Sequence, residues 1–191
     1  MRAGIALRSA LLLVTLVFWA GCSSTPEASR DATVPETHRS RDGRLQYVTP
    51  AGWFDATADS QAAGHAVWII RNDYGATLTI DEVRFDAAAG AAVREGGLEP
   101  LARLLMTLPS GDRPVRALSG PEAFERNGKV YCGYRVEVYE TRDMLRVVLF
   151  RADERVYSST LVVPAAARER GADQLLEAQT AFLGSVTWSS L

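Results

Sequence analysis

The side chains that usually carry chemistry are few in this chain. It has two histidines and two cysteines. His38 lies in a polar N-terminal segment and His65 lies among small residues, so neither HExxH nor another paired metal-ligand spacing occurs. No serine stands in a GxSxG motif, and no glycine-rich phosphate loop precedes a helical pattern. The sequence therefore predicts no metal, no cofactor and no catalytic residues, and we expect the protein not to be an enzyme.

Two further groups were considered as catalytic candidates. Asp81 and Glu82 stand side by side at the end of a predicted strand. Neighbouring residues of a strand point to opposite faces of a sheet, so these carboxylates should not work together as an acid–base pair. Ser110 has no histidine near it in the sequence. A triad assembled from distant residues stays open as an alternative.

The thiol with the most informative context is Cys22. It follows two arginines, an apolar run over residues 10–20 and one glycine. A basic start, a short apolar core and small residues before the cut are typical of an export signal. The run is shorter than the roughly 20 apolar residues of a membrane-spanning helix, and polar residues begin at Ser23. We therefore expect residues 1–21 to be a signal peptide.

The segment Trp19-Ala20-Gly21-Cys22 resembles the bacterial lipobox, although Trp19 stands where that motif usually has Leu or a smaller aliphatic residue. The resemblance implies that a diacylglyceryl group is attached to the sulfur of Cys22 and that the new amino terminus is acylated. Several acyl chains together hold a protein stably at a membrane. Ser23, rather than Asp, follows the cysteine, which by the same resemblance favours the outer over the inner membrane. An ordinary secretory signal cut near Ala20 is the alternative.

The segment after the signal is predicted to be a flexible spacer. Residues 22–42, which begin with the lipidated cysteine, are rich in Ser, Thr, Pro and charged side chains and contain no aromatic residue. Such a composition buries too little surface to offset the entropy of ordering. As a random coil it would hold the domain roughly 25 Å from the lipid. Residues 43–191 remain as one domain of ordinary size.

The charge of the chain limits its partners. Loss of residues 1–21 removes two arginines and no acidic residue, which takes the formal charge from −2 to −4. A nucleic-acid partner would need a basic stripe, whereas charges of both signs alternate along this chain. We expect no nucleic-acid partner.

Alternating apolar side chains separated by turn residues predict a series of strands. The strands are expected at 44–49, 66–71, 76–85, 115–118, 123–126, 129–140, 144–151 and 155–163. Helical spacing predicts helices over 98–108 and 173–183, the second with Asp173 as its N-cap. Most of the strands follow one another through short turns. The expected fold is therefore α+β, with a single antiparallel sheet and flanking helices.

Three segments carry a resemblance to a known family: the strand and turn 47–53, the antiparallel run 131–163, and the helix ending in Phe182-Leu183-Gly184-Ser185-Val186. They resemble the PsbP-like α/β/α sandwich family, which includes photosystem accessory proteins and many bacterial envelope lipoproteins. The resemblance implies a non-enzymatic accessory or docking module and identifies no binding residues here. Trp53 is expected to pack over the end of the sheet rather than to stack on a ligand.

Alternation along the strand 129–140 separates a core face from a candidate binding face. Cys132 falls on the face with Val130, Tyr134, Val136 and Val138, so we expect a buried core thiol rather than a reactive one.

The opposite face of that strand presents Tyr131, Arg135, Glu137 and Tyr139, with Arg146 on the following strand. Tyr and Arg are enriched at interface anchors, which makes this face the candidate binding surface. Cross-strand pairing, or cover by a helix, is the alternative for these side chains.

Taken together, these patterns predict a lipid-anchored protein of the bacterial cell envelope that faces the periplasm, with the outer membrane favoured. We expect it to act by binding an envelope protein or by supporting an assembly, and we leave its binding residues unassigned. One alternative is an envelope hydrolase with a site built from scattered residues. The other is a carrier for a small apolar ligand, which would require an internal cavity.

Overall fold

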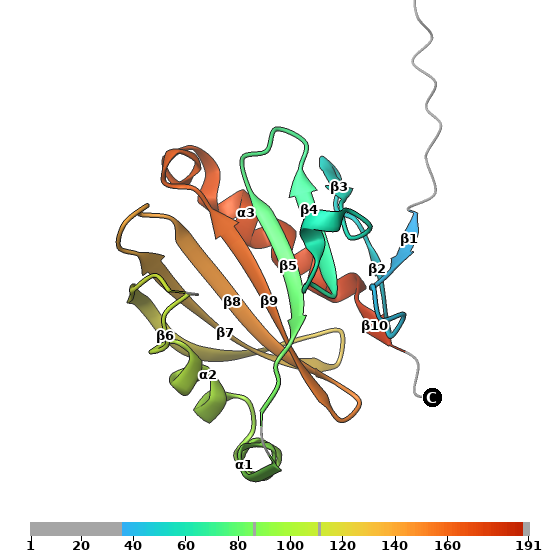
Figure 1. Ribbon diagram of the computed structural model, residues 1–191, viewed down its shortest axis with the longest axis vertical. Coiled ribbons are helices and arrows are strands. Elements are labelled where there is room, and N and C mark those ends of the chain that lie inside the picture. Colours follow the sequence, from blue (N-terminus) through green and yellow to red (C-terminus); the bar gives the residue numbers. More distant parts are fainter. Residues whose placement is uncertain (1–35, 86, 111, 189–191) are drawn as a thin grey trace, which may run out of the picture. The chain divides into compact units, whose positions relative to one another are not determined.

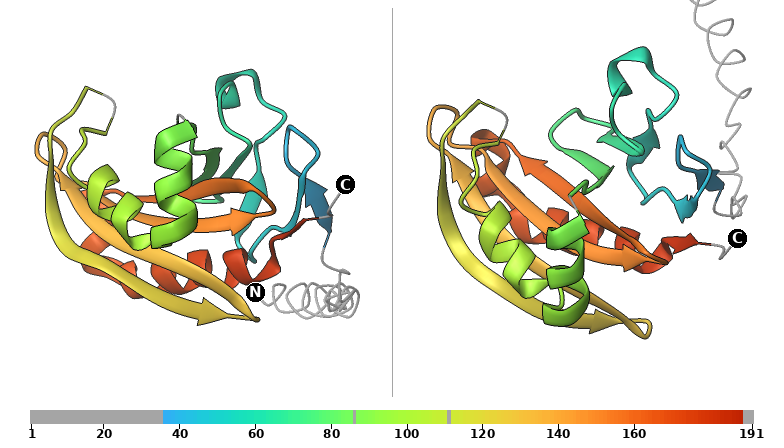
Figure 2. Two further views of the ribbon diagram at one scale, coloured as in Figure 1. Left: turned by 90° about the horizontal axis from the view of Figure 1, so that it is seen from below. Right: turned by 60° about the horizontal axis from the view of Figure 1, so that its bottom comes forward.

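The computed structural model describes residues 36–85, 87–110 and 112–188 (Figure 1). The expected signal peptide, Cys22 and most of the expected spacer lie outside these residues. Within them the chain forms mostly antiparallel sheet with a few helices, so the predicted α+β class is confirmed. Helix α3 covers one face of the main sheet, and α1 and α2 lie on the other (Figure 2).

The main sheet has seven strands in the order β3-β4-β5-β9-β8-β7-β6. Their bounds are β3 Trp53–Asp55, β4 Val67–Arg71, β5 Thr77–Glu82, β6 Val115–Arg126, β7 Lys129–Val138, β8 Met144–Ala152 and β9 Arg155–Val163. The strands β6 to β9 follow one another through short turns, as the sequence predicts for most of the strands. Asn127 and Gly128 both have positive φ at the β6–β7 turn, as a tight two-residue hairpin requires.

Strand β6 was predicted as two separate strands, 115–118 and 123–126. It is one strand whose register with β7 shifts between Ala117 and Ser119 and again between Ser119 and Glu122. Gly120 and Pro121 lie in this irregular part, and proline cannot donate to a ladder. These two residues look like a strand end in the sequence, but in the fold they mark a bulged edge strand.

Among the described residues the chain forms three α-helices where two helices were predicted. Helix α1, Ala87–Gly96, was not predicted because its alanine-rich sequence has no leucine periodicity. Helix α2, Glu99–Leu105, is shorter than the expected 98–108. Helix α3, Ala165–Ser185, begins before Asp173 and is interrupted at Gly171, which has non-helical backbone angles. Pro164 takes the N-cap position of the first segment, and the non-helical backbone of Gly171 separates it from the segment that contains Asp173.

A second, three-stranded sheet of order β1-β2-β10 corrects the expectation of a single sheet. It consists of β1 Thr37–Arg39, β2 Leu45–Val48 and β10 Thr187–Trp188. The end of the expected spacer therefore belongs to the fold. His38 is in register with Tyr47 on β2, and its Nδ1 lies 3.2 Å from a carboxylate oxygen of Asp55. Ser40 is buried, and its hydroxyl accepts a hydrogen bond from the Leu45 N–H at 2.9 Å.

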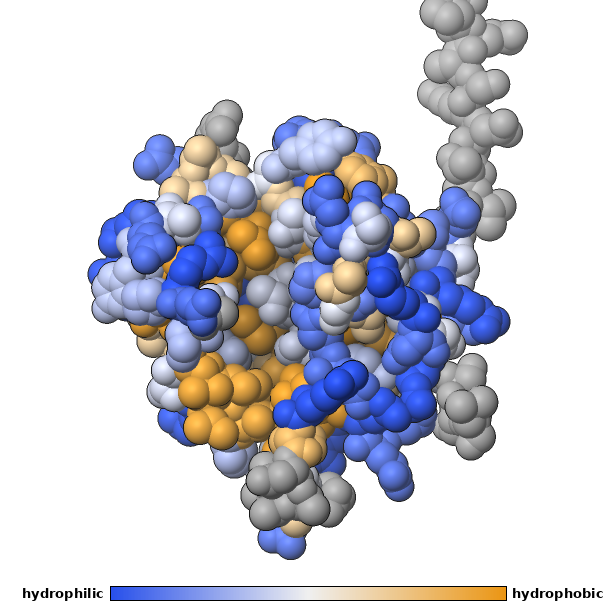
Figure 3. Space-filling view, viewed as in Figure 1, coloured by the Kyte–Doolittle hydropathy of each residue, from blue (hydrophilic) through white to orange (hydrophobic). Residues whose placement is uncertain are grey.

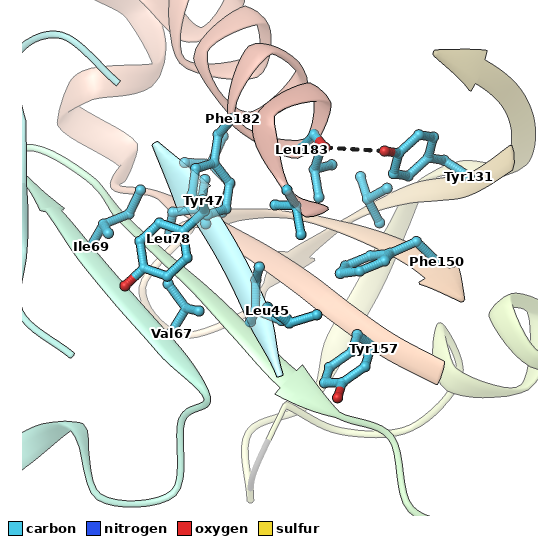
Figure 4. Packing of buried hydrophobic residues seen from close by; sticks show 14 of the residues in the cluster. Leu45, Tyr47, Val67, Ile69, Leu78, Tyr131, Phe150, Tyr157, Phe182 and Leu183 are labelled. Atoms are coloured by element: carbon cyan, nitrogen blue, oxygen red, sulfur yellow. Dashed lines mark hydrogen bonds between the residues drawn. The ribbon is translucent and has the colours of Figure 1, made fainter. Parts of the chain in front are cut away.

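The larger hydrophobic core lies between α3 and the sheets (Figure 4). The rings of Tyr47 and Phe182 meet edge to face with centroids 5.6 Å apart. The Tyr131 hydroxyl donates to the Leu183 carbonyl at 3.1 Å. Trp53 packs against this core, as expected. The core thus fixes the C-terminal half of α3 on the sheet.

A second hydrophobic cluster lies on the opposite face and contains Cys132, Tyr134 and residues of α2. Cys132 is 1% exposed, and burial raises the pKa of its thiol, so the expected core role is confirmed. Val130 was expected on the same buried face but is 60% exposed, because it lies beside the β6–β7 turn.

Candidate functional site: a groove beside helix α3

The candidate binding face of β7 lies against α3. Tyr131 is buried there and donates a hydrogen bond to a carbonyl of α3. Glu137 is 1% exposed. Tyr139 follows the end of β7 and is exposed. Tyr131 and Glu137 are therefore covered by a helix, which was the alternative to binding, and their contacts stabilise the fold. Arg135 and Arg146 remain as candidates for binding.

Glu137 is the centre of an ion cluster that ties three elements together. Its carboxylate lies 2.7 Å from Arg116 on β6, 2.9 Å from Arg142 in the β7–β8 turn and 2.7 Å from Arg168 on α3. The hydrogen bond from Arg168, followed by the charges of the three arginines, holds the pKa of this carboxyl below its usual range despite burial. The cluster therefore fastens the first part of α3 to the sheet.

Arg135 and Arg146 are direct cross-strand partners on β7 and β8, on the face toward α3. Like charges placed opposite each other normally destabilise a sheet. Arg135 is exposed, and its Nε lies 3.4 Å from the Ser119 hydroxyl. Neither arginine has a carboxylate within ion-pair distance among the residues that the structure describes. The pair is therefore a local concentration of positive charge that no ion pair within the described residues neutralises.

Arg146 is held in one orientation by α3. Its Nη1 donates to the Leu176 carbonyl at 2.9 Å, to the Thr180 hydroxyl at 2.8 Å and to Gln179 Oε1 at 3.3 Å. Its Cζ lies 5.7 Å from the centroid of the Phe124 ring, within range of a cation–π contact. Burial, and then the charge of Arg135, lower the pKa of Arg146. An arginine nevertheless remains charged, so a partly desolvated cation is fixed at this position.

A groove of about 610 Å³ opens at this pair, between α3 and the strands β6 to β8. We call it the α3 groove. Its charged lining consists of Glu122, Arg126, Arg135, Arg146 and Glu177, and its apolar lining includes Phe124, Leu176 and Ala181. A second hollow, which also involves Arg135 and Leu176, extends toward Gly171 on α3. The volume lies within the range of about 300–1,000 Å³ that is usual for binding sites.

The other face of the sheet carries a smaller hollow of about 320 Å³ beside α2, which we call the α2 cleft. Its walls include Leu105, Met106, Leu145 and Val147, with Thr160 at its polar side. Figure 3 views this face and shows apolar side chains around a depression beside α2. The cleft is open to solvent, whereas the carrier hypothesis called for an internal cavity.

The histidine at residue 65 has a carboxylate partner that the sequence did not reveal. His65 Nδ1 lies 2.7 Å from Asp81 Oδ1, and the Thr79 hydroxyl lies 3.2 Å from the other oxygen. Glu82 pairs with Arg155 instead, so the expectation that Asp81 and Glu82 do not act together is supported. Because the partners are far apart in sequence, no local motif could have indicated the His65–Asp81 pair.

The His65–Asp81 pair does not form a nucleophilic triad with Ser158, the serine in register with Asp81. In a triad the histidine lies between the nucleophile and the acid. Here Asp81 on β5 is in register with Ser158 on β9, whereas His65 approaches from the β4 side. The acid thus lies between the histidine and Ser158, so Ser158 is not placed as the nucleophile of such a triad.

Metal binding and membrane spanning can be assessed only for the described residues. No group of three or more His, Cys, Asp or Glu side chains lies close enough there to hold a metal ion. In the same part of the chain, no helix has the length and apolar character needed to cross a bilayer.

Comparison with known proteins gives similarities at the level of structure. No family model matches the chain, and no curated protein matches it. The cyanobacterial PsbP protein CyanoP from Synechocystis sp. PCC 6803 is similar, with a TM-score of 0.48 and 16% identity, over 81% of this chain and 92% of that one. LpqN of Mycobacterium tuberculosis, a protein involved in cell envelope biogenesis, has a TM-score of 0.47 and 12% identity, over 82% and 91% of the two chains. Both TM-scores are below 0.5, so these similarities do not indicate a function for the chain.

Proposed function

We propose that this chain is a lipid-anchored protein of the bacterial envelope that acts, without catalysis, by binding a segment of a partner protein in the α3 groove. The anchor is the lipid on Cys22, and the domain faces the periplasm from the outer membrane. The sequence around Cys22 supports the anchor, and the geometry of the groove supports the mode of action.

The observation that carries the proposal is the cross-strand pair Arg135 and Arg146 at the groove, neither of which forms an ion pair among the described residues. A protein that used these arginines only for stability would be expected to pair them with acids, as it does for Arg116 and Arg168 at Glu137. Arginine next to an aromatic ring in a partly desolvated groove is typical of an interface anchor. The apolar lining contributed by Phe124 and Leu176 adds the area that such an anchor needs.

Position-dependent photo-crosslinking in the native envelope tests the proposal. A photoreactive residue would replace Glu177, which is exposed at the groove, or Tyr74, which is exposed at the distant β4–β5 turn. We expect the photoreactive residue at position 177 to capture one partner protein reproducibly, and the residue at position 74 not to capture it. Mass spectrometry identifies the captured protein. Equal capture from both positions, or none from Glu177, would contradict the proposal.

The α2 cleft favours a second candidate, the carrier of a small apolar ligand. Leu104 is 56% exposed on α2, and the neighbouring Leu105 and Met106 line the cleft with Val147. A fluorescent apolar probe that binds the full chain, and that Val147→Asp excludes, would support the carrier. If Val147→Asp leaves probe binding unchanged, the probe binds outside the α2 cleft and the carrier function is rejected.

A further inference from the structure

We propose that Arg146 is a subsite for a carboxylate, and that the partner segment in the α3 groove presents a chain terminus or an acidic side chain to it. This inference rests on the proposed function, because it names the chemistry that the groove recognises.

Only one of the three guanidinium nitrogens of Arg146 donates hydrogen bonds within the described residues. All three of its hydrogen bonds start from Nη1 and end on α3. Nε and Nη2 have no acceptor among the residues that the structure describes. These two N–H groups share one edge of the planar guanidinium, and such an edge donates to both oxygens of a carboxylate in parallel. The edge is therefore oriented by α3 and left without a partner.

The surroundings of this edge favour an anion. Arg135 lies directly across from Arg146 on the neighbouring strand and repels it. A bound carboxylate would relieve that repulsion. The ring of Phe124, whose centroid lies 5.7 Å from the Arg146 Cζ, also limits the movement of the guanidinium.

The charge of the groove favours a monoanion. Three arginines and two glutamates line it, which leaves one net positive charge. One carboxylate neutralises that charge. A phosphate dianion would leave the groove with a net negative charge, and Glu122 and Glu177 would repel the dianion. Neither glutamate forms an ion pair within the described residues, so both remain available to accept N–H donors of a polypeptide.

The uncharged lining of the α3 groove fits an apolar group next to the carboxylate of the ligand. Leu176 and Ala181 lie on α3, opposite Phe124 on β6. A ligand with an apolar side chain next to its carboxylate would use both parts of the groove. N-acetyl-leucine has this composition, N-acetyl-leucinamide lacks only the charge, and isoamyl phosphate replaces the carboxylate by a phosphate.

The test is a titration of the purified full chain with these three probes, followed by NMR of the arginine Nε–H signals. The Arg146 signal is assigned by its loss in Arg146→Lys. We expect N-acetyl-leucine to shift this signal saturably, N-acetyl-leucinamide not to shift it, and isoamyl phosphate to bind more weakly. Equal effects of the acid and the amide would overturn the carboxylate subsite, and tighter binding of the phosphate would overturn the choice of anion.

Variants give an independent readout with a matched control. Arg146→Met should weaken N-acetyl-leucine binding about tenfold or more, which is the range for a lost charge-assisted hydrogen bond. Arg103→Met makes the same change on α2, where Arg103 forms an exposed pair with Glu99, and should leave binding unchanged. Because Arg146 also holds α3, the wild-type titration remains decisive if Arg146→Met fails to fold. Equal affinities of wild type and folded Arg146→Met would overturn the inference.

Competition connects the subsite to the partner. N-acetyl-leucine in excess should reduce photo-capture from Glu177 in the envelope, because both would occupy the Arg146 edge. If a partner is captured from the groove but the acid neither shifts Arg146 nor competes, the binding module stands and the carboxylate subsite fails. If no partner is captured from the groove at all, the proposed function itself fails.

Discussion

The hydroxyl of Tyr131 on β7 donates a hydrogen bond to the carbonyl of Leu183 near the end of α3, across 3.1 Å. Both side chains are buried in the larger core. The bond therefore links the strand that carries Arg135 to the helix that forms the opposite wall of the α3 groove. The shape of the groove depends on contacts of this kind as well as on its own lining.

Tyr131→Phe removes only the hydroxyl of this bond. The Leu183 carbonyl then loses a buried partner, so we expect the free energy of unfolding to fall by about 1 kcal/mol. Urea denaturation followed by circular dichroism measures the change. Tyr139→Phe, at an exposed tyrosine, is the matched control and should have no effect. Equal stability of wild type and Tyr131→Phe would show that the bond does not hold α3.

The ion cluster at Glu137 should make the stability depend on pH. The folded-state pKa of Glu137 lies below its ordinary value of 4.5, so its stabilising contribution is complete well above that pH. The contribution is lost as the pH falls through the lower folded-state pKa. Glu137→Gln leaves three arginines without their carboxylate and should destabilise the chain at neutral pH.

The difference in unfolding free energy between wild type and Glu137→Gln should therefore shrink as the solution is acidified below pH 4.5. Urea titrations at a series of pH values measure it. Glu122→Gln, at an exposed glutamate outside the ion pairs, should show little difference at any pH. A difference between wild type and Glu137→Gln that grows on acidification would contradict the assignment.

Thr49 offers a change that should increase stability. Its Oγ1 is buried and finds no hydrogen-bond partner among the described residues. A buried hydroxyl without a partner costs about 1–3 kcal/mol, and valine has nearly the same shape without the hydroxyl. We expect Thr49→Val to raise the free energy of unfolding by about 1 kcal/mol, measured by urea denaturation. A loss of stability would mean that the hydroxyl is satisfied.

Cys22 should determine where the protein resides in the cell. With its acyl chains, the full chain is expected in the membrane fraction, and mass spectrometry should find the lipid on the cysteine. Cys22→Ser cannot form the thioether and should appear without lipid outside the membrane fraction. Cys132→Ser, at the buried thiol, should leave the distribution unchanged. Membrane association of Cys22→Ser equal to that of wild type would contradict the anchor.

Local patterns predicted the parts of the fold that depend on local chemistry. Alternation and turn residues correctly indicated β7, β8 and β9 and the short turns between them, because side-chain period and turn residues act within a few positions. Strand β1 was missed because its polar residues gain their order from pairing with β2. Helix α1 was missed because small alanine side chains show no clear apolar face.

The candidate site was predicted only in part for a similar reason. Alternation placed Arg135 and Arg146 on one face, and the structure brings them together. The sequence could not show that Glu137 has three arginine partners while Arg135 and Arg146 form no ion pair within the described residues. These contacts depend on the register of β6 and β7, on the β7–β8 turn and on where α3 crosses the sheet. The wall of the groove at Leu176 and Ala181 was expected only as part of a helix, without its place opposite Phe124.

The central claim is that the partner binds in the α3 groove. Its most direct test is to fill the groove by a substitution and to measure how tightly the partner identified by crosslinking from position 177 then binds the chain. Ala181→Trp places a large ring in the groove at an exposed position of α3, and Tyr74→Trp is the matched control outside it. We expect the dissociation constant to rise about tenfold or more for Ala181→Trp and to remain unchanged for Tyr74→Trp. An unchanged dissociation constant for a folded Ala181→Trp chain would contradict binding in the α3 groove.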